Sequence, residues 1–143
     1  MRLILTTIAG AALIELALTA AQAPTPSIEG SWRSPGGNSI IAIAPCGDAW
    51  CGTVQWASEK AKQDSRKTVD QLVGTQLLTG LQQKSPGQWQ GKLFIPDKNM
   101  RVTAKLQPVG DTQLRVSGCA LGKSMCKAAL WTRTDGTTPP PGG

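Results

Sequence analysis

Apolar and polar residues alternate along much of the chain, and the alternation is clearest from Met100 to Leu106. In this stretch the even-numbered residues are apolar, whereas Arg101, Thr103 and Lys105 between them are polar. A period of two places the apolar residues on one face of a β-strand. The stretch is therefore predicted to be a strand with one face buried in a core.

Further stretches have strand-like patterns, namely 30–33, 40–44, 53–56, 76–81, 88–95, 113–119 and 126–133. Residues typical of turns separate several of them, at 34–38, 85–87, 96–99 and 110–111. About eight short strands, with turns roughly every 8 to 12 residues, predict an all-β fold. We favour a single small antiparallel barrel over a sandwich, because closing a meander of hairpins on itself removes exposed sheet edges.

The segment 58–70 has a different composition from these strands. It is rich in charged residues and has almost no apolar ones. We expect a solvated loop or a short surface helix that lies as a flap over one end of the fold.

The N-terminus has the pattern of a signal peptide. Arg2 follows the first residue, residues 3–20 are almost wholly apolar, and small residues occur at Ala21 and Ala23. Pro24 disfavours cleavage after Ala23, so we predict a signal peptide over residues 1–21.

A membrane anchor is the alternative for this segment. Glu15 argues against it, because a carboxylate is costly inside a permanent span. After cleavage the chain is predicted to comprise a disordered lead (22–28), one barrel domain (29–134) and a disordered Pro- and Gly-containing tail (135–143). We expect the mature protein in the periplasm of a bacterium or secreted from it.

The four cysteines agree with export, because an even number in a small exported chain indicates disulfides. They fall in two close pairs that each flank a predicted turn. We therefore predict the bonds Cys46–Cys51 and Cys119–Cys126. A four-thiolate zinc site is the alternative, although the spacing within each pair is wider than in zinc knuckles.

The formal net charge of +6 favours anionic partners such as envelope polymers or lipid headgroups. The basic residues are scattered along predicted strands and loops, and the aromatic residues do not alternate with them. A nucleic-acid-binding groove would need both features, so no nucleic-acid partner is predicted.

The two ends of the predicted barrel carry a pair of residues that resembles the closure of lipocalin-like (calycin) barrels. Gly30-x-Trp32 lies on the first strand and Arg133 on the last. In such barrels a first-strand Trp packs against an Arg near the C-terminus, with a favourable cation–π contact. An ordinary core Trp and a surface Arg are the alternative.

Longer motifs resemble an uncharacterised bacterial family catalogued as domain of unknown function 2147. They are Pro45-Cys46-Gly47 with Cys51-Gly52, the run from Trp89-x-Gly91 to Pro96-Asp97, Gly118-Cys119, and Trp131-Thr132-Arg133. The resemblance implies an exported lipocalin-like barrel and no agreed activity, substrate or cofactor. The chain differs from the family pattern at Asn99, where members often carry Gly, and at Val102, where they often carry an aromatic residue.

No catalytic role is predicted. The chain has no histidine, and it lacks a serine nucleophile elbow, a phosphate-binding loop and the spacing of metal ligands. The carboxylates lie in turns, loops or at a strand end, where capping explains them. Asp48 and Asp97 are acid–base candidates only if they meet at one mouth of the barrel.

A barrel of this size is either filled by side chains or holds one small ligand. Our first hypothesis is a carrier or sensor of a small hydrophobic or amphipathic ligand, with a cavity lined by Trp56, Trp89, Val54, Leu93, Val102, Leu106 and Trp131.

The second hypothesis is an envelope interaction module that contacts an anionic polymer or a partner protein through its basic surface and Trp50. Trp50 lies in the loop that Cys46 and Cys51 close, so its side chain either points outward to a partner or folds back as a lid on the barrel end.

Overall fold

The computed structural model describes residues 10–12, 14–15, 17, 27–120 and 125–137. Most of the predicted signal peptide, residues 22–26 of the predicted lead and residues 138–143 of the predicted tail lie outside the described residues. None of the helices in the described part of the chain has the length and apolar character needed to cross a lipid bilayer.

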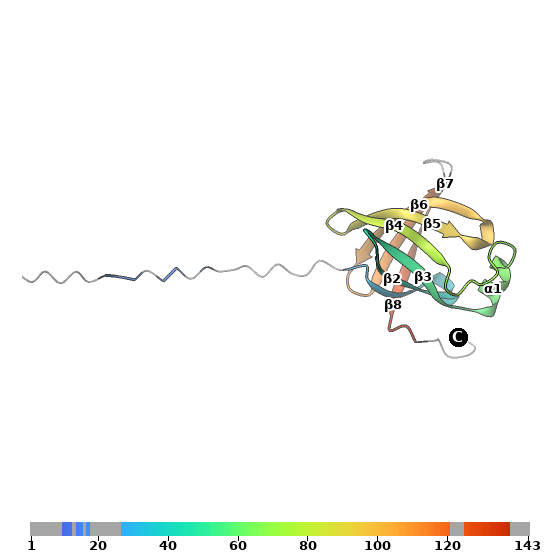
Figure 1. Ribbon diagram of the computed structural model, residues 1–143, viewed down its shortest axis with the longest axis horizontal. Helices are drawn as coiled ribbons and strands as arrows, with labels where there is room; N and C mark the ends of the chain where they lie inside the picture. Colours follow the sequence, from blue (N-terminus) through green and yellow to red (C-terminus); the bar gives the residue numbers. More distant parts are fainter. Residues whose placement is uncertain (1–9, 13, 16, 18–26, 121–124, 138–143) are drawn as a thin grey trace, which may run out of the picture.

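The described chain forms a closed barrel of eight antiparallel strands, as predicted (Figure 1). Each strand pairs with the next along the chain, and β8 pairs back with β1. The strands are β1 (Gly30–Arg33), β2 (Ser39–Cys46), β3 (Ala49–Ala57), β4 (Gln76–Ser85), β5 (Gln88–Ile95), β6 (Met100–Val109), β7 (Gln113–Ala120) and β8 (Met125–Thr134).

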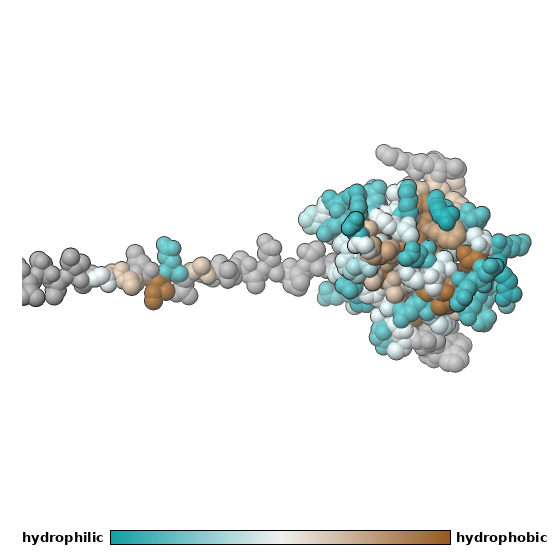
Figure 2. Space-filling view, in the orientation of Figure 1, coloured by the Kyte–Doolittle hydropathy of each residue, from teal (hydrophilic) through white to brown (hydrophobic). Residues whose placement is uncertain are grey.

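The period of two in the sequence follows the inside and outside of the barrel. In β6, Val102, Ala104 and Leu106 are buried, whereas Arg101 and Lys105 are exposed. Hydrophilic residues consequently cover most of the outer surface in Figure 2, with smaller hydrophobic areas between them.

The register of β2 against β3 shifts once, between Ile40 and Ile41, where β3 has an extra residue between Val54 and Trp56. Ile40 and Ile41 are both buried, with 0% and 1% of their surfaces exposed. Ile41 and Ile43 belong to the main cluster of buried residues and Ile40 does not, so successive side chains of β2 still point to opposite faces. The apolar run in the sequence therefore corresponds to burial on both faces of the sheet at Ile40 and Ile41.

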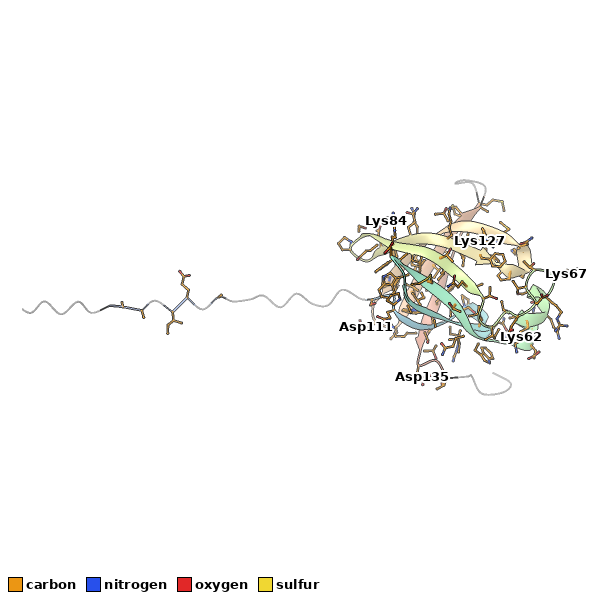
Figure 3. All side chains as sticks on the ribbon, viewed as in Figure 1. Lys62, Lys67, Lys84, Asp111, Lys127 and Asp135 are labelled. Atoms are coloured by element: carbon orange, nitrogen blue, oxygen red, sulfur yellow. A yellow bond between two sulfur atoms is a disulfide. The ribbon has the colours of Figure 1, made fainter. Side chains whose placement is uncertain are left out.

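The barrel has two different ends (Figure 1). At the closed end, residues 27–29 enter the barrel and tight turns connect β2 to β3, β4 to β5 and β6 to β7. At the opposite end, named the helix end here, lie the 3₁₀ turn η1 (Pro35–Gly37), the helix α1 (Glu59–Ser65) and the 3₁₀ turn η2 (Pro96–Lys98). Figure 3 shows Lys84 and Asp111 at the closed end, and Lys62 and Lys67 at the helix end.

Helix α1 is the short surface helix that was one of two expectations for segment 58–70. The side-chain oxygen of Ser58 caps it by accepting a hydrogen bond of 3.1 Å from the backbone N–H of Ala61. Ala61 packs against a small cluster of buried residues formed by Val54, Ala57 and Leu72. The helix and the chain that follows it therefore cover part of the helix end.

Both predicted disulfides are present, Cys46–Cys51 at the closed end and Cys119–Cys126 between β7 and β8. The zinc alternative is wrong, because all four sulfur atoms are bonded in pairs and no thiolate remains to bind a metal.

Candidate functional site

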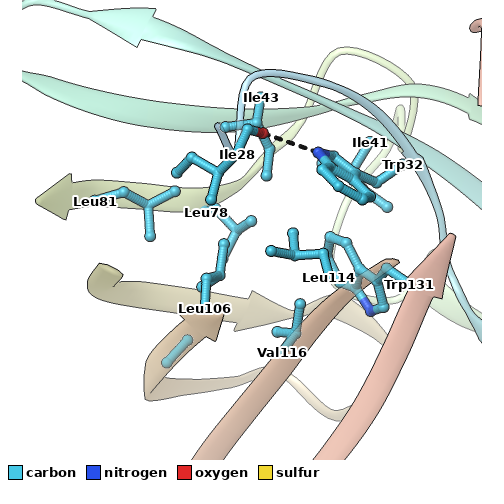
Figure 4. Close-up of a cluster of buried hydrophobic side chains, with 11 residues drawn as sticks. Ile28, Trp32, Ile41, Ile43, Leu78, Leu81, Leu106, Leu114, Val116 and Trp131 are labelled. Carbon is cyan, nitrogen blue, oxygen red and sulfur yellow. Dashed lines mark hydrogen bonds between the residues drawn. The ribbon is translucent and has the colours of Figure 1, made fainter. Parts of the chain in front are cut away.

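The closed end of the barrel is sealed by Trp32 and Arg133. The indole of Trp32 is fully buried, and its Nε1–H donates a hydrogen bond of 2.9 Å to the carbonyl oxygen of Ile28 (Figure 4). The guanidinium carbon of Arg133 lies 4.2 Å from the centre of the Trp32 ring. The structure thus brings together the two residues whose pairing was expected from the resemblance to lipocalin-like barrels.

Arg133 also binds the chain that enters the barrel. It donates hydrogen bonds to the backbone oxygens of Ser27, Glu29 and Asp111, at 3.0, 2.8 and 2.9 Å. Ile28, which lies between Ser27 and Glu29 in the sequence, is fully buried in the main core. The expectation of a disordered lead is therefore wrong for Ser27 and Ile28, which form part of the closure.

The inner face of the barrel changes from packed to open towards the helix end. On β6, Leu106 and Ala104 have no exposed surface, Val102 is 7% exposed, and Met100 is only half-buried. The main core lies on the packed side (Figure 4) and consists of Ile28, Trp32, Ile41, Ile43, Leu78, Leu81, Ala104, Leu106, Leu114, Val116 and Trp131.

Strand β8 shows the same gradient. Every second residue back from Trp131 lies on the inward row of this strand. Trp131 is 7% exposed and Ala129 is half-buried, whereas Lys127 and Met125 are exposed. The register of β7 against β8 places Gly118 opposite Lys127. On β6 and β8 the inward side chains near the helix end are thus more exposed than those near the closed end, and they leave space between them.

This space is a cavity of about 350 Å³ at the helix end, between β5, β6, β7, β8 and η2. Nearly all of its lining is apolar. The lining residues are Leu93, Ile95, Lys98, Met100, Val102, Val116, Gly118, Ala120, Met125, Lys127, Ala128, Ala129 and Trp131.

Gly118 and Val102 lie side by side on the cavity wall. A Cβ on Gly118 would lie 2.9 Å from a methyl carbon of Val102, so the wall cannot take a side chain there without displacing Val102. Val102, one of the two departures from the pattern that the sequence resembles, is a side chain of moderate size on the same wall. Asn99, the other departure, has φ of +47°, a left-handed conformation that glycine adopts freely and asparagine tolerates.

Among the described residues, Lys98 and Lys127 are the only charged ones that line the cavity. Neither forms an ion pair in the part of the chain that the structure describes, where the two ion pairs present are Lys60–Asp64 and Lys62–Glu59 within α1. The hydrogen bond from Lys60 to Asp64 raises the pKa of that lysine above its ordinary value. The lysines of α1 are thus compensated locally, whereas the two at the cavity are not.

A second hollow of about 320 Å³ lies beside the first at the helix end, between η1, α1 and η2. Polar groups make up more of its wall, including Ser34, Asn38, Asp64 and Asp97. Its mixed lining makes it a poorer match than the first cavity to an apolar ligand.

Three of the residues expected to line a ligand cavity, Leu93, Val102 and Trp131, lie on its wall. The other four lie elsewhere. Leu106 is in the packed core, Trp89 packs against that core, Val54 lies in the small cluster next to α1, and Trp56 is half-buried outside both clusters of described residues.

Trp50 folds back onto the barrel, which is one of the two arrangements that the sequence left open. Its ring packs edge-on against Trp89, with 5.6 Å between the ring centres, and both rings contact the main core. This packing holds the half-buried side chain against the closed end and not outward towards a partner.

Lys98, Lys127 and several apolar residues of the cavity wall were not among the residues expected from the sequence to line a cavity. The signal for Lys127 was present in the sequence, because counting in twos from Trp131 places it on the inward row. Asp48 and Asp97 do not meet, because Asp48 lies in the β2–β3 turn at the closed end and Asp97 lies in η2 at the helix end.

Comparison with known proteins agrees with this architecture. A family model described as "Uncharacterized protein conserved in bacteria (DUF2147)" matches residues 30–133. A solved structure of protein HP1028 from Helicobacter pylori, described as belonging to the lipocalin family, is similar in fold, with a TM-score of 0.61 and 14% sequence identity over 77% of this chain and 84% of that chain. No curated protein sequence matches the chain.

Proposed function

The chain belongs to the DUF2147 family of uncharacterized bacterial proteins, and on that premise we propose that it is an exported barrel protein that binds one small hydrophobic or amphipathic ligand. The ligand occupies the cavity at the helix end. The main support for this proposal is that the inward side chains become more exposed towards the helix end. This happens from Leu106 to Met100 on β6 and from Trp131 to Met125 on β8.

The size and lining of the cavity support binding. Ligand pockets in proteins usually measure about 300 to 1,000 Å³ and are lined mainly by apolar side chains with a few polar groups. The cavity of about 350 Å³, with two lysines in an otherwise apolar wall, fits the lower part of that range. An eight-stranded barrel is also the smallest common barrel that holds a ligand.

The similarity in fold to a lipocalin-family protein is compatible with this proposal. We propose a bacterial periplasmic or extracellular location, because two disulfides are most stable in an oxidising compartment and the N-terminal sequence has the pattern of a signal peptide. We also propose binding without catalysis, since the two acid–base candidates, Asp48 and Asp97, lie at opposite ends of the barrel.

The test compares native and denaturing mass spectra of the mature protein purified from the periplasm of the bacterial host. We expect a native mass that exceeds the denatured mass by one discrete lipophilic species. The matched variants are Ala129→Phe, which fills the cavity, and Ala44→Phe, which places the same ring on the exposed outer face of β2.

The bound species should be lost from Ala129→Phe and retained by Ala44→Phe. Equal native and denatured masses would be followed by titration with decanoate and decanol. Failure of both compounds to bind would overturn the proposal.

A second candidate function is binding of an anionic envelope polymer to the outer face of the barrel. The strands β5 to β8 contain no Asp or Glu, and their polar faces carry Lys92, Arg101, Lys105 and Arg115. Trp50 does not belong to this face. The test is retention on immobilised dextran sulfate, which should fall in Lys105→Gln/Arg115→Gln and remain in Lys84→Gln, and should weaken with rising salt.

A further inference from the structure

We propose that the ligand of the cavity is a single-chain amphiphile with an anionic headgroup, which Lys98 and Lys127 bind at the mouth while the chain extends inward to Trp131. This inference rests on the proposed function and adds the chemical class of the ligand. It arises from the position of the two lysines relative to the apolar wall.

Lys127 occupies a position where the strand pattern calls for an apolar residue. Its neighbours on the inward row of β8 are Met125 and Ala129, and Gly118 lies opposite it on β7. The glycine itself has no side chain to pack on the lysine stem, and Val102 of β6 lies 2.9 Å from the place where its Cβ would be. A long lysine side chain can pack its methylene groups on an apolar wall and keep its ammonium group at the water boundary.

Lys98 reaches the same cavity from another element. It is the last residue of η2, and the chain reverses immediately after it at Asn99 into β6. Its neighbour Asp97 lines the second hollow and not the cavity. Two of the three residues of η2 thus place opposite charges in different hollows. Asp97 faces the second hollow, and Lys98 faces the apolar cavity.

In the part of the chain that the structure describes, no carboxylate lines the cavity to balance these two ammonium groups. The lining residues include no Asp or Glu, and neither lysine has an ion-pair partner among the described residues. The four strands around the cavity are also free of acidic residues. An anion at the mouth would supply the missing partner, and hydrogen bonds between ions of opposite charge are stronger than neutral ones.

The cavity wall determines the rest of the ligand. Below the lysines the wall includes Val102, Val116, Ala129 and Trp131, whose side chains are apolar apart from the indole N–H of Trp131. This part of the cavity fits an alkyl chain, whose burial is favourable for each methylene group removed from water. A volume of about 350 Å³ lies near the lower limit for ligand pockets and suits one chain better than the two of a diacyl lipid.

The test uses isothermal titration calorimetry of the mature protein with three compounds that share a ten-carbon chain, decanoate, decanol and decyltrimethylammonium. All are used below the concentrations at which they form micelles or separate. At low ionic strength we expect decanoate to bind about tenfold or more tightly than decanol. The cationic compound should bind more weakly than decanol.

The preference for decanoate should fall to about twofold or less in Lys98→Gln/Lys127→Gln, while the affinity for decanol stays nearly constant. The matched control is Lys105→Gln/Arg115→Gln, which removes two positive charges from the outer faces of neighbouring strands. This control should retain the full preference, because its charges do not line the cavity.

The outcomes separate this inference from the proposed function. Equal binding of decanoate and decanol by the unaltered protein, or an unchanged preference in Lys98→Gln/Lys127→Gln, would overturn the anionic headgroup and leave an apolar ligand. Absence of binding by all three compounds would overturn both proposals. Repeating the titration with decyl phosphate distinguishes a carboxylate from a phosphate headgroup by relative affinity.

Discussion

The guanidinium of Arg133, on the last strand of the barrel, lies over the indole ring of Trp32 on the first, with 4.2 Å from the guanidinium carbon to the ring centre. The two strands meet at the seam where the sheet closes. Strand β1 has only four residues, and three of them, Ser31, Trp32 and Arg33, pair with β8. Because β1 is so short, its hydrogen bonds alone hold the seam weakly. The contact between Arg133 and Trp32 adds side-chain binding at this point.

Arg133→Lys should lower the free energy of unfolding by about 2 to 3 kcal/mol. A lysine has one ammonium group and cannot reach the backbone oxygens of Ser27, Glu29 and Asp111 together while it covers Trp32. Urea denaturation of the mature protein, with both disulfides intact, measures the change. Arg115→Lys, on the exposed face of β7, should remain within about 0.5 kcal/mol. Equal values for the two variants would contradict a role for Arg133 in closure.

Gly30→Ala should lower the free energy of unfolding by about 3 kcal/mol. The residue has φ of +129°, and an added Cβ would lie 2.6 Å from Nη1 of Arg133, so backbone strain and a clash add together. Gly110→Ala isolates the strain, because Gly110 also has positive φ but no atom within 4 Å of the added carbon. We expect this control to lower the free energy of unfolding by about 1 kcal/mol. Thermal or urea unfolding compares the two, and similar losses would argue against the clash.

Two tryptophans whose indole nitrogens are buried should respond differently to replacement by phenylalanine. Trp32→Phe leaves the buried carbonyl oxygen of Ile28 without its indole donor, and we expect a loss of about 2 kcal/mol in the free energy of unfolding. Trp89→Phe should cost less than about 1 kcal/mol, because its buried Nε1 has no hydrogen-bond partner among the described residues. Urea denaturation of both variants tests this order, and a larger loss for Trp89→Phe would refute it.

The two disulfides should differ in their effect on ligand binding. Each closes a short loop and stabilises the fold by about 2 to 2.5 kcal/mol in the chain-entropy estimate. Cys119→Ser/Cys126→Ser loosens the β7–β8 pair next to Gly118, Ala120 and Lys127, which line the cavity, and should weaken decanoate binding several-fold.

Cys46→Ser/Cys51→Ser is the matched control at the closed end. It should lose a similar amount of stability and keep nearly the full affinity, which calorimetry at a temperature well below unfolding would establish. Equal losses of affinity in both variants would show that the effect follows from stability alone.

The fold was predictable because local pattern and topology agree in this chain. The alternation from Met100 to Leu106 defined an inward row that the structure contains, and Gly- and Pro-rich turns marked the hairpins. The pairing of the four cysteines into two disulfides was predictable for the same reason, because the members of each pair lie close in sequence on either side of a predicted turn. The register shift between β2 and β3 gave no such signal, because Ile40 and Ile41 are both apolar and both buried, and this pattern is the same with or without the shift.

The cavity was harder to predict, because a period of two gives the face of a strand and not the end of the barrel. Trp89 and Leu106 are opposite each other in the register and lie near the closed end, whereas Leu93 and Val102, also opposite each other, lie at the cavity. Distinguishing them requires following the direction of each strand through every turn. Lys127 was missed for another reason, since a charged residue on a strand is normally assigned to solvent.

Because packing is tight at the closed end of the barrel and open at the helix end, mutations in the two halves should have different effects on stability. Residues such as Leu106 and Leu114 at the closed end have no spare space around them, so natural variation there is limited by folding. Residues such as Met100 and Ala129 face an open cavity and tolerate changes of size with little loss of stability. Substitutions at the helix end can therefore change the size and shape of the cavity, whereas substitutions at the closed end are constrained by the packing that holds the barrel together.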